Sequence, residues 1–331
     1  SMSFNDSCQI QSQAVAQTAE CRTVLLLYQG LAVGGIETLI VRTANYLVGR
    51  EKTVIVAASD GPLRPLLKRE IVFIDIKDAR RHINAANIMM EFLYRANDLM
   101  VVSFDPISRF LAEFTIQQIL RRRSDIEIRH VSGCFHPRAY FIEGQSYFRK
   151  LFNVSLANLL GNGNVFFMNE ICRSSHAERL RSVYNSQIIQ IPVESSKRTW
   201  NPTKFSANKI VAVGRIVEFK AYNFGLLDVV EELRRSDIPL SVDIFGWGPQ
   251  EGSLREEIMT RGLSDIARFH GMLRYQDFDN EVVKYDIFVG TGTAAMQAAC
   301  LGIPTIVAID RERRDCYGYI FKLPKGILGE Q

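Results

Sequence analysis

Two cations, Arg215 and Lys220, follow the strand expected at 209–213, in which residues 210–213 are all apolar. A guanidinium group binds phosphate through a fork of N–H donors, and an ammonium group beside it acts as a point charge. An arginine and a lysine five residues apart at the end of a strand therefore suit a diphosphate. Two surface cations that flank a loop are the structural alternative.

Glycine-containing segments follow three further strands. GTGTAAMQ at 290–297 joins a strand to a helix, so free amides and hydroxyls converge where a pyrophosphate would bind. QGLAVGGIET at 29–38 places Gly34 and Gly35 at the start of a helix, where the alternative is a tight turn. DIFGWGP at 243–249 runs through Gly246 toward a helix. The segment at 29–38 is neither a GxGxxG fingerprint nor a P-loop, and no GxGxxG with a downstream acidic residue appears in the chain.

A metal site is the competing chemistry, and we weighed it on one cluster. His130, Cys134 and His136 have even spacing, so on a strand they would share one face. No fourth ligand is close in sequence, and we predict no metal site. The six cysteines form no CxxC pair, which favours reduced thiols in a cytosolic protein.

The elements that position these residues alternate between apolar β-rich runs and helix-length segments. Residues 36–48 have apolar side chains at helical spacing. Continuously apolar strands are typical of parallel sheets buried on both faces, so we predict an α/β, doubly wound fold. The expected strands are 23–28, 53–58, 71–76, 99–103, 126–131, 164–168, 187–191, 209–213, 240–245, 266–270, 287–289 and 304–309.

A break in composition at 191–207 divides this pattern into two Rossmann-like domains. We expect residues 1–20 to be disordered or derived from the expression vector, and residues 21–195 to form the first domain. A linker at 196–208 leads to a second domain at 209–331, where truncation of the natural chain stays open. Ligands bind beyond the carboxyl ends of such strands, so we expect the two domains to face a central cleft.

The ordered set VGR…K, IFGWGP…L, FHG and DIFVG…GIPTI over 209–306 resembles the GT-B glycosyltransferases, most closely the family 4 enzymes of bacterial polysaccharide and lipopolysaccharide synthesis. The resemblance extends over about 23–310. It implies two Rossmann-like domains, with the acceptor bound mainly by the first and the nucleotide sugar by the second. It also implies transfer without a metal or another cofactor, because arginine and lysine neutralise the leaving diphosphate.

The resemblance assigns roles to particular residues. Arg215 and Lys220 would hold the diphosphate and act as catalytic cations. The remaining donor contacts would come from Gly34 and Gly35, Gly246, the backbone near Met272 and Leu273, and the amides of Gly292, Thr293 and Ala294. His136, just after a strand, would be the catalytic residue that faces the sugar, with His130 as the second choice. A surface histidine is the alternative.

The chain departs from the family at two positions. The two glutamates that the family usually carries eight residues apart fall on Val289 and Gln297. Gln297 can still hydrogen-bond the ribose hydroxyls as a neutral group, whereas Val289 cannot replace the first glutamate. Retention of configuration is the outcome that the family implies.

Composition and charge restrict the partners. Hydrophobic residues make up 47% and charged residues 23% of the 331 residues, which is typical of a globular protein. No apolar run is long enough to cross a bilayer. The net charge of +4 includes the run Arg121–Arg123, which is typical of a solvated helix end, with contact to anionic lipid headgroups as the alternative. No signature for nucleic acid is present.

The resemblance, together with these observations, predicts a cytoplasmic hexosyltransferase, with peripheral contact at the inner face of the membrane as an option. It would move a sugar from a UDP- or GDP-type donor to a hydroxyl of a lipid-linked bacterial glycan. One alternative is a degenerate GT-B protein that acts as a binding partner, which the two missing glutamates favour. A sugar-nucleotide epimerase is the other, and it would need a carboxylate pair that the sequence does not show.

Overall fold

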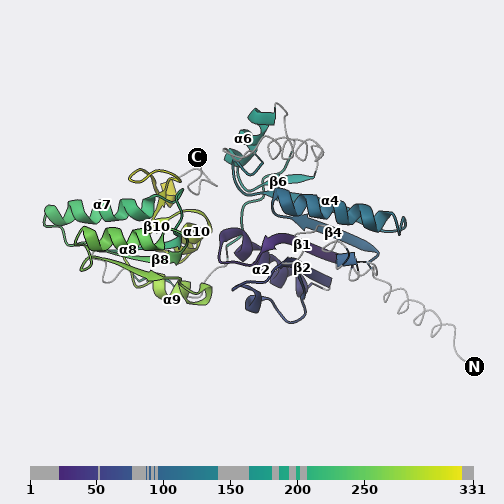
Figure 1. The fold of residues 1–331 in the computed structure, drawn as a ribbon, viewed down its shortest axis with the longest axis horizontal. Helices are drawn as coiled ribbons and strands as arrows, with labels where there is room; N and C mark the ends of the chain where they lie inside the picture. The colour runs from purple at the N-terminus through teal and green to yellow at the C-terminus, as the bar shows by residue number, and fades with distance from the viewer. Residues whose placement is uncertain are drawn as a thin grey trace, which may run out of the picture. The chain divides into compact units, whose positions relative to one another are not determined.

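The computed structural model describes residues 22–50, 53–76, 87, 89–90, 93, 96–140, 164–180, 186–193, 199–201 and 207–322 (Figure 1). The chain divides into two compact units. The first comprises Ser1–Phe166 with Leu180–Gln187, and the second comprises Phe167–Arg179 with Ile188–Gln331. Each unit contains one six-stranded sheet and is described by itself.

The sheet of the first unit has the strand order β3-β2-β1-β4-β5-β6, which is the order of dinucleotide-binding domains. Pairing is parallel from β3 through to β5. The strands are β1 (Arg22–Gly30), β2 (Thr53–Ser59), β3 (Val72–Asp75), β4 (Asp98–Ser103), β5 (Glu127–Cys134) and β6 (Val165–Phe167). The helices are α2 (Gly35–Val48) and α4 (Pro106–Leu120); α6 (Glu170–Leu180), which follows β6, belongs to the second unit except for Leu180.

Both faces of this sheet are covered. Leu25 and Leu27 of β1 belong to a core cluster that includes the inward side of α4. Val24 and Leu26, which point to the opposite face of the same strand, are buried as well. The helix α2 packs against β1 and β2. The strands are continuously apolar in the sequence because both faces of this sheet are buried.

The second unit repeats the same order, since its sheet runs β12-β11-β10-β7-β8-β9. All pairs are parallel except that β12 is antiparallel to β11. The strands are β7 (Lys209–Arg215), β8 (Ser241–Trp247), β9 (Ala267–Gly271), β10 (Ile287–Gly290), β11 (Thr305–Ala308) and β12 (Cys316–Tyr319). The helices are α7 (Tyr222–Arg235), α8 (Glu251–Thr260), α9 (Phe278–Val282) and α10 (Gly292–Cys300). Short 3₁₀ helices cover Arg64–Leu66, Tyr275–Asp277 and Ile320–Lys322.

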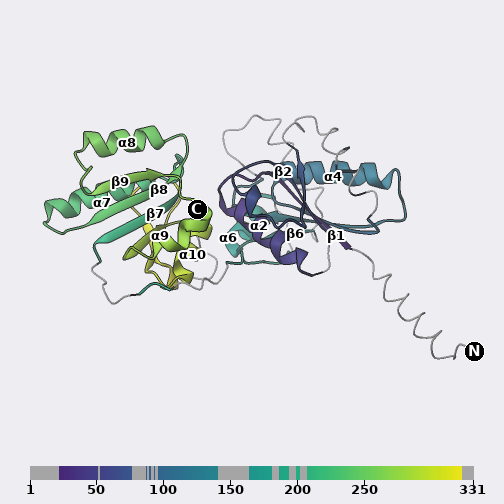
Figure 2. The same ribbon diagram turned by 90° about the horizontal axis from the view of Figure 1, so that it is seen from below.

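Helices lie on both faces of the second sheet (Figure 2). The apolar residues of α7 and α8 join one core cluster, and those of α9 and α10 join another on the opposite face. The predicted doubly wound α/β fold is thereby confirmed. Two details differ from the prediction. The strand expected at 187–191 is reduced to a single bridge between Ile188 and Phe167, and the antiparallel edge strand β12 was not predicted.

Among the described residues, no helix has the length and apolar character that crossing a membrane requires.

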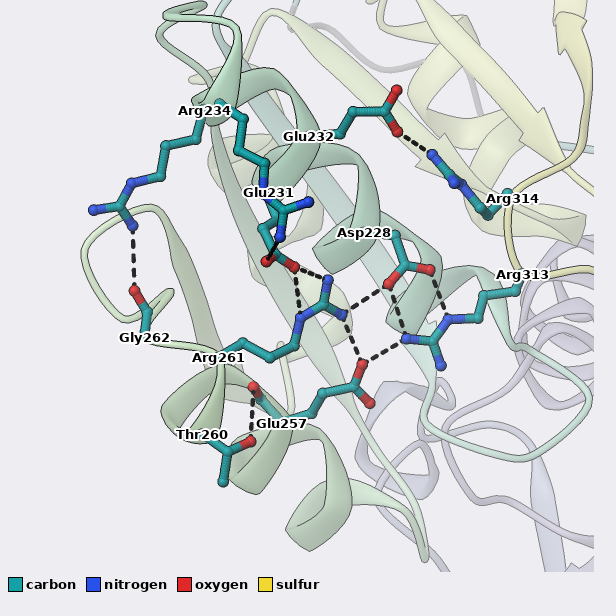
Figure 3. Close-up of polar contacts among 11 residues, drawn as sticks. Asp228, Glu231, Glu232, Arg234, Glu257, Thr260, Arg261, Gly262, Arg313 and Arg314 are labelled. Carbon is teal, nitrogen blue, oxygen red and sulfur yellow. Dashed lines mark hydrogen bonds and ion pairs between the residues drawn. The ribbon is translucent and has the colours of Figure 1, made fainter.

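A charge network joins α7 and α8 to the segment after β11 (Figure 3). The Arg261 guanidinium donates to Asp228 and Glu257 at 2.8 Å each, and it also pairs with Glu231. Arg313 donates to Asp228 at 2.7 Å and to Glu257 at 2.5 Å. The neighbouring guanidinium groups hold the pKa of Asp228 below its usual value, with Arg313 as the largest cause. The network therefore fixes the segment that follows β11 onto two helices.

The backbone of this segment also touches α7 directly. A Cβ atom built on Gly225 would lie 1.5 Å from the Arg313 carbonyl oxygen, a distance at which the two cannot coexist. Only glycine at 225 allows this approach. Gly252 of α8 is a helix glycine with nothing within 4 Å of its Cβ position, and it offers a matched control.

We expect Gly225→Ala to destabilise the protein by about 2–4 kcal/mol, because the Arg313 segment must move away from α7. Gly252→Ala should instead stabilise it by about 0.5–1 kcal/mol, the gain of alanine over glycine in an open helix position. Chemical denaturation of both variants measures the two changes. Equal stabilities for the two variants would show that the close approach at Gly225 carries no energetic weight.

Candidate functional site

The strand order of the second sheet creates a switch point between β7 and β10. The two strands are neighbours, with Ala212 paired to Val289, and the chain proceeds from them toward opposite edges of the sheet. Loops that leave such a pair diverge, and the crevice beyond their carboxyl ends is where ligands bind in open α/β sheets. Arg215 ends β7, and Gly292 begins α10 just after β10.

The loop that follows β7 holds the two predicted cations in a closed turn. Arg215 is exposed, and its guanidinium lies 5.6 Å from the centre of the Phe219 ring. The Lys220 amide donates to the Val217 carbonyl at 2.9 Å. The buried side chain of Asn223 donates to the Lys220 carbonyl at 3.0 Å, so the first turn of α7 fixes the end of the loop.

The Lys220 ammonium reaches back toward the end of β7. A Cβ atom built on Gly214 would lie 3.5 Å from Lys220 Nζ and 3.1 Å from Tyr222 Oη, so glycine leaves room for both groups. Loss of water around the half-buried Lys220 lowers its pKa to about 8. Arg215 adds to this lowering and the Asp310 carboxylate opposes it. Lys220 is therefore a mostly protonated cation that lacks much of its hydration, which favours an anionic ligand.

Two groups near Lys220 were not among the predicted site residues. Asp310 follows β11, and burial raises its pKa to about 6 although Lys220 and Arg215 oppose the shift. Burial also raises the pKa of Tyr222, and the Asp310 carboxylate adds to that effect. The sequence signal for Asp310 was its place just after a predicted strand, but only the strand order brings that strand next to β10.

The N-terminus of α10 offers an open backbone surface. Gly292 has φ 64°, a left-handed conformation that favours glycine, and nothing lies within 4 Å of its Cβ position. Thr293 and Ala294 follow in the first turn, which contains no acidic residue. Amides in the first turn of a helix have no partner within the helix and attract anions. The structure thus brings Gly292, Thr293 and Ala294 to the same switch point as Arg215.

Gln297 lies one turn further along α10, on its buried side. Its amide nitrogen donates to Asp279 Oδ1 of α9 at 3.1 Å, and the residue is only 8% exposed. The contact ties α10 to α9. A bond from Gln297 to a ribose stays a prediction, while Val289, at the other glutamate position, is a core residue of β10.

The remaining predicted donor contacts of this unit lie along β8 and β9. A Cβ atom on Gly246 would approach the Gly214 carbonyl oxygen to 2.0 Å, so packing between β7 and β8 already requires glycine there. Met272 is 50% exposed and follows β9, whereas Leu273 packs on the core. Because β9 is two strands from β7, the two strands lie about 10 Å apart. That distance would allow the base to lie at the end of β9 while the diphosphate lies at the end of β7.

In the first unit, Gly34 and Gly35 form the beginning of α2. Gly34 is the N-cap in an extended conformation, and its carbonyl accepts from the Thr38 amide at 3.0 Å. The carboxylate of Glu37 occupies the space that a Cβ atom on Gly34 would enter. A negative charge therefore already lies at this helix N-terminus, and the phosphate contact of Gly34 and Gly35 stays a prediction.

His136 and His130 occupy different environments. His136 is exposed beyond the end of β5, and its Nδ1 atom accepts from the Arg138 amide at 3.0 Å. This bond places the proton of the neutral ring on Nε2. His130 is buried, with Glu113 Oε1 2.7 Å from its Nδ1 and Ser103 Oγ 3.0 Å from its Nε2. His130 lies within β5, and a role for either histidine at the sugar stays a prediction.

Among the residues that the structure describes, no three His, Cys, Asp or Glu side chains are grouped in a way that could hold a metal ion.

Several solved structures share this fold. A variant of S. aureus TarM, solved with fondaparinux, α-GlcNAc-glycerol and UDP, has a TM-score of 0.64 at 12% identity, over 88% of this chain and 86% of that chain. Anabaena HepE, in complex with UDP and glucose, has a TM-score of 0.66 at 14% identity, over 85% and 79%. The lipopolysaccharide outer core galactosyltransferase WaaB, in its apo form, has a TM-score of 0.55 at 13% identity, over 86% and 79%.

No protein-family model and no curated protein matches the sequence. At these identities the structural likeness establishes the fold, and it confirms the predicted GT-B architecture of two Rossmann-like units.

The contact between Gln297 and Asp279 yields a prediction. Gln297→Glu would place two carboxylates about 3 Å apart in a poorly hydrated position, and we expect a loss of about 1–3 kcal/mol at pH 7.5. Combining it with Asp279→Asn should recover most of the loss, because an amide again donates to a carboxylate. Urea denaturation of the single and double variants tests this coupling. Additive effects would show that the two side chains do not interact.

Proposed function

We propose that this chain is a glycosyltransferase that moves a sugar from a nucleoside diphosphate sugar to a hydroxyl group. The observation that supports it most strongly is the convergence of Arg215, Lys220 and the first amides of α10 at the switch point of the second sheet. Donor groups of these three kinds suit a diphosphate. The fold is shared with HepE, which was solved with UDP and glucose.

In this proposal the second unit stabilises the leaving group. As the bond from the sugar carbon to the diphosphate oxygen breaks, negative charge develops on the diphosphate. Arg215 lies in place through its contact with the Phe219 ring, and Lys220 through its closed turn. Fixed charges of this kind stabilise a transition state without reorganisation, which is the largest single contribution in many enzymes. Gly292, Thr293 and Ala294 would bind the same group through their amides.

The first unit would bind the acceptor. In this proposal the ring of His136, an exposed residue after β5, would hydrogen-bond a sugar hydroxyl or the acceptor. We infer a glycan, carried on a lipid, as the acceptor, since WaaB acts on lipopolysaccharide and shares the fold. Arg121 and Arg122 are exposed at the end of α4 and would contact anionic lipid at the inner face of the membrane.

We expect Arg215→Ala and Lys220→Ala each to weaken UDP binding by about ten- to a hundredfold, because each removes a charged partner of the diphosphate. Lys209→Ala is the matched control, since Lys209 is an exposed cation at the opposite end of the same strand. Calorimetric titration with UDP gives the affinities, and thermal denaturation checks that the variants fold. Unchanged affinity in both site variants would contradict the proposed function.

We also propose that transfer requires no divalent metal, because Arg215 and Lys220 supply the positive charge. Turnover of the best donor from a panel of UDP- and GDP-sugars should then be unchanged in EDTA. A large loss of turnover that Mg²⁺ or Mn²⁺ restores would show that a metal ion neutralises the diphosphate instead.

A further inference from the structure

A carboxyl group with a buried oxygen lies beside the cations of the proposed diphosphate site. Within the described part of the chain, Asp310 Oδ1 is buried and has no hydrogen-bond partner. A buried carboxylate oxygen without a donor is unfavourable, and native structures keep few such atoms. Because Asp310 lies beside Lys220 and Arg215, the missing hydrogen bond of Oδ1 would be supplied when this carboxyl group binds a proton or a ligand.

Backbone and side-chain contacts hold Asp310 in this position. The Arg311 amide donates to the Phe219 carbonyl at 2.5 Å, which joins the residue after Asp310 to the residue before Lys220. Beyond Arg311, the next two arginines pair with carboxylates of α7 and α8 (Figure 3). The segment is therefore fixed at both its backbone and its side chains, so Asp310 cannot leave the site without breaking several contacts.

The charged and titratable groups that act on Asp310 come from β7, from the loop after it, from α7 and from the segment of Asp310 itself. Arg215 ends β7, Lys220 belongs to the loop that follows, and Arg311 belongs to the same segment as Asp310. Tyr222 belongs to α7. Burial raises the pKa of Asp310 to about 6 against all three cations, so both the charged and the neutral forms of its carboxyl are accessible near neutral pH.

A bound diphosphate would change this balance. It neutralises Arg215 and Lys220, the cations that favour the charged carboxylate, and it adds negative charge close to the same group. A protonated carboxyl has an O–H donor, which a phosphate oxygen accepts, whereas a carboxylate has only acceptors. We propose that Asp310 takes up one proton from solvent when a nucleoside diphosphate binds, and donates it in a hydrogen bond to a phosphate oxygen.

Asp310 would return this proton when the nucleotide leaves, so affinity would fall as pH rises above the pKa of the free site. The inference rests on the proposed function, because it needs a diphosphate at Lys220. It adds a ligand-binding residue and a coupling to pH that the two cations alone do not produce.

The test is calorimetric titration of UDP-glucose at pH 6.5 in two buffers with different heats of ionisation. UDP-glucose is a diphosphate diester and has no phosphate proton that titrates near this pH. The difference in heat between the buffers counts the protons taken up. With a pKa of about 6, about three-quarters of the Asp310 carboxyls are ionised at pH 6.5, so the wild-type chain should take up more than half a proton per nucleotide.

Two variants show whether Asp310 is the group that takes up the proton. Asp310→Asn should bind UDP-glucose with markedly less uptake, while Asp265→Asn, which removes an exposed carboxylate at the amino end of β9, should match the wild type. Because removal of Asp310 also lowers the pKa of Lys220, the comparison is repeated in a Lys220→Arg background, where position 220 does not titrate. Uptake should then fall close to zero in the double variant.

The affinity gives an independent readout. Between pH 6.5 and 7.5 the wild-type affinity should fall about five- to tenfold, and that of Asp310→Asn in the Lys220→Arg background should fall much less. Binding without proton uptake, or equal uptake in the wild type and in both Asp310→Asn chains, overturns this inference alone. Failure of the wild-type chain to bind UDP-glucose overturns the proposed function together with it.

Discussion

The candidate site of the second unit depends on one constraint, a half-buried lysine ammonium that has lost part of its hydration. Lys220 lies against Gly214 and Tyr222, and its lowered pKa records the cost of removing water from a charge. A closed turn, a buried asparagine and a glycine at the strand end all serve to keep it there. Such a charge interacts with an anion more strongly than a solvated surface lysine does. The Asp310 carboxylate raises the pKa of Lys220 in turn, while burial, opposed by Lys220, raises the pKa of Asp310 to about 6.

The two units share one strand order but differ at their switch points. In the second unit, cations and uncovered amides meet beyond β7 and β10. In the first, the Glu37 carboxylate lies beside the N-terminus of α2, and the Asp105 carboxylate caps α4, the counterpart of α10. The same topology thus places opposite charge at the two switch points. This asymmetry supports a division of labour, with the diphosphate bound by the second unit and a neutral, hydroxyl-rich acceptor by the first.

Much of the fold was predictable because parallel strands buried on both faces appear in the sequence as continuous apolar runs, and the Gly292 and Arg215 motifs follow such strands. Contacts between segments that are distant in the sequence were not predictable. Three features of the site depend on the strand order and on where the helices lie, which the sequence does not show. They are the burial of Asp310, the hydrogen bond from Gln297 to Asp279, and the close approach of β7 that requires glycine at position 246. The short antiparallel β12 has too few apolar residues to give a signal.

Hydrogen exchange with and without UDP tests the central claim most directly, since it reports where the nucleotide binds. If the diphosphate lies at the switch point of the second sheet, backbone amides at 214–220 and 291–295 should exchange more slowly with UDP. Amides of α8, which packs against the edge strand β9, serve as the internal reference. Protection confined to the first unit, or unchanged exchange in both segments, would contradict the account.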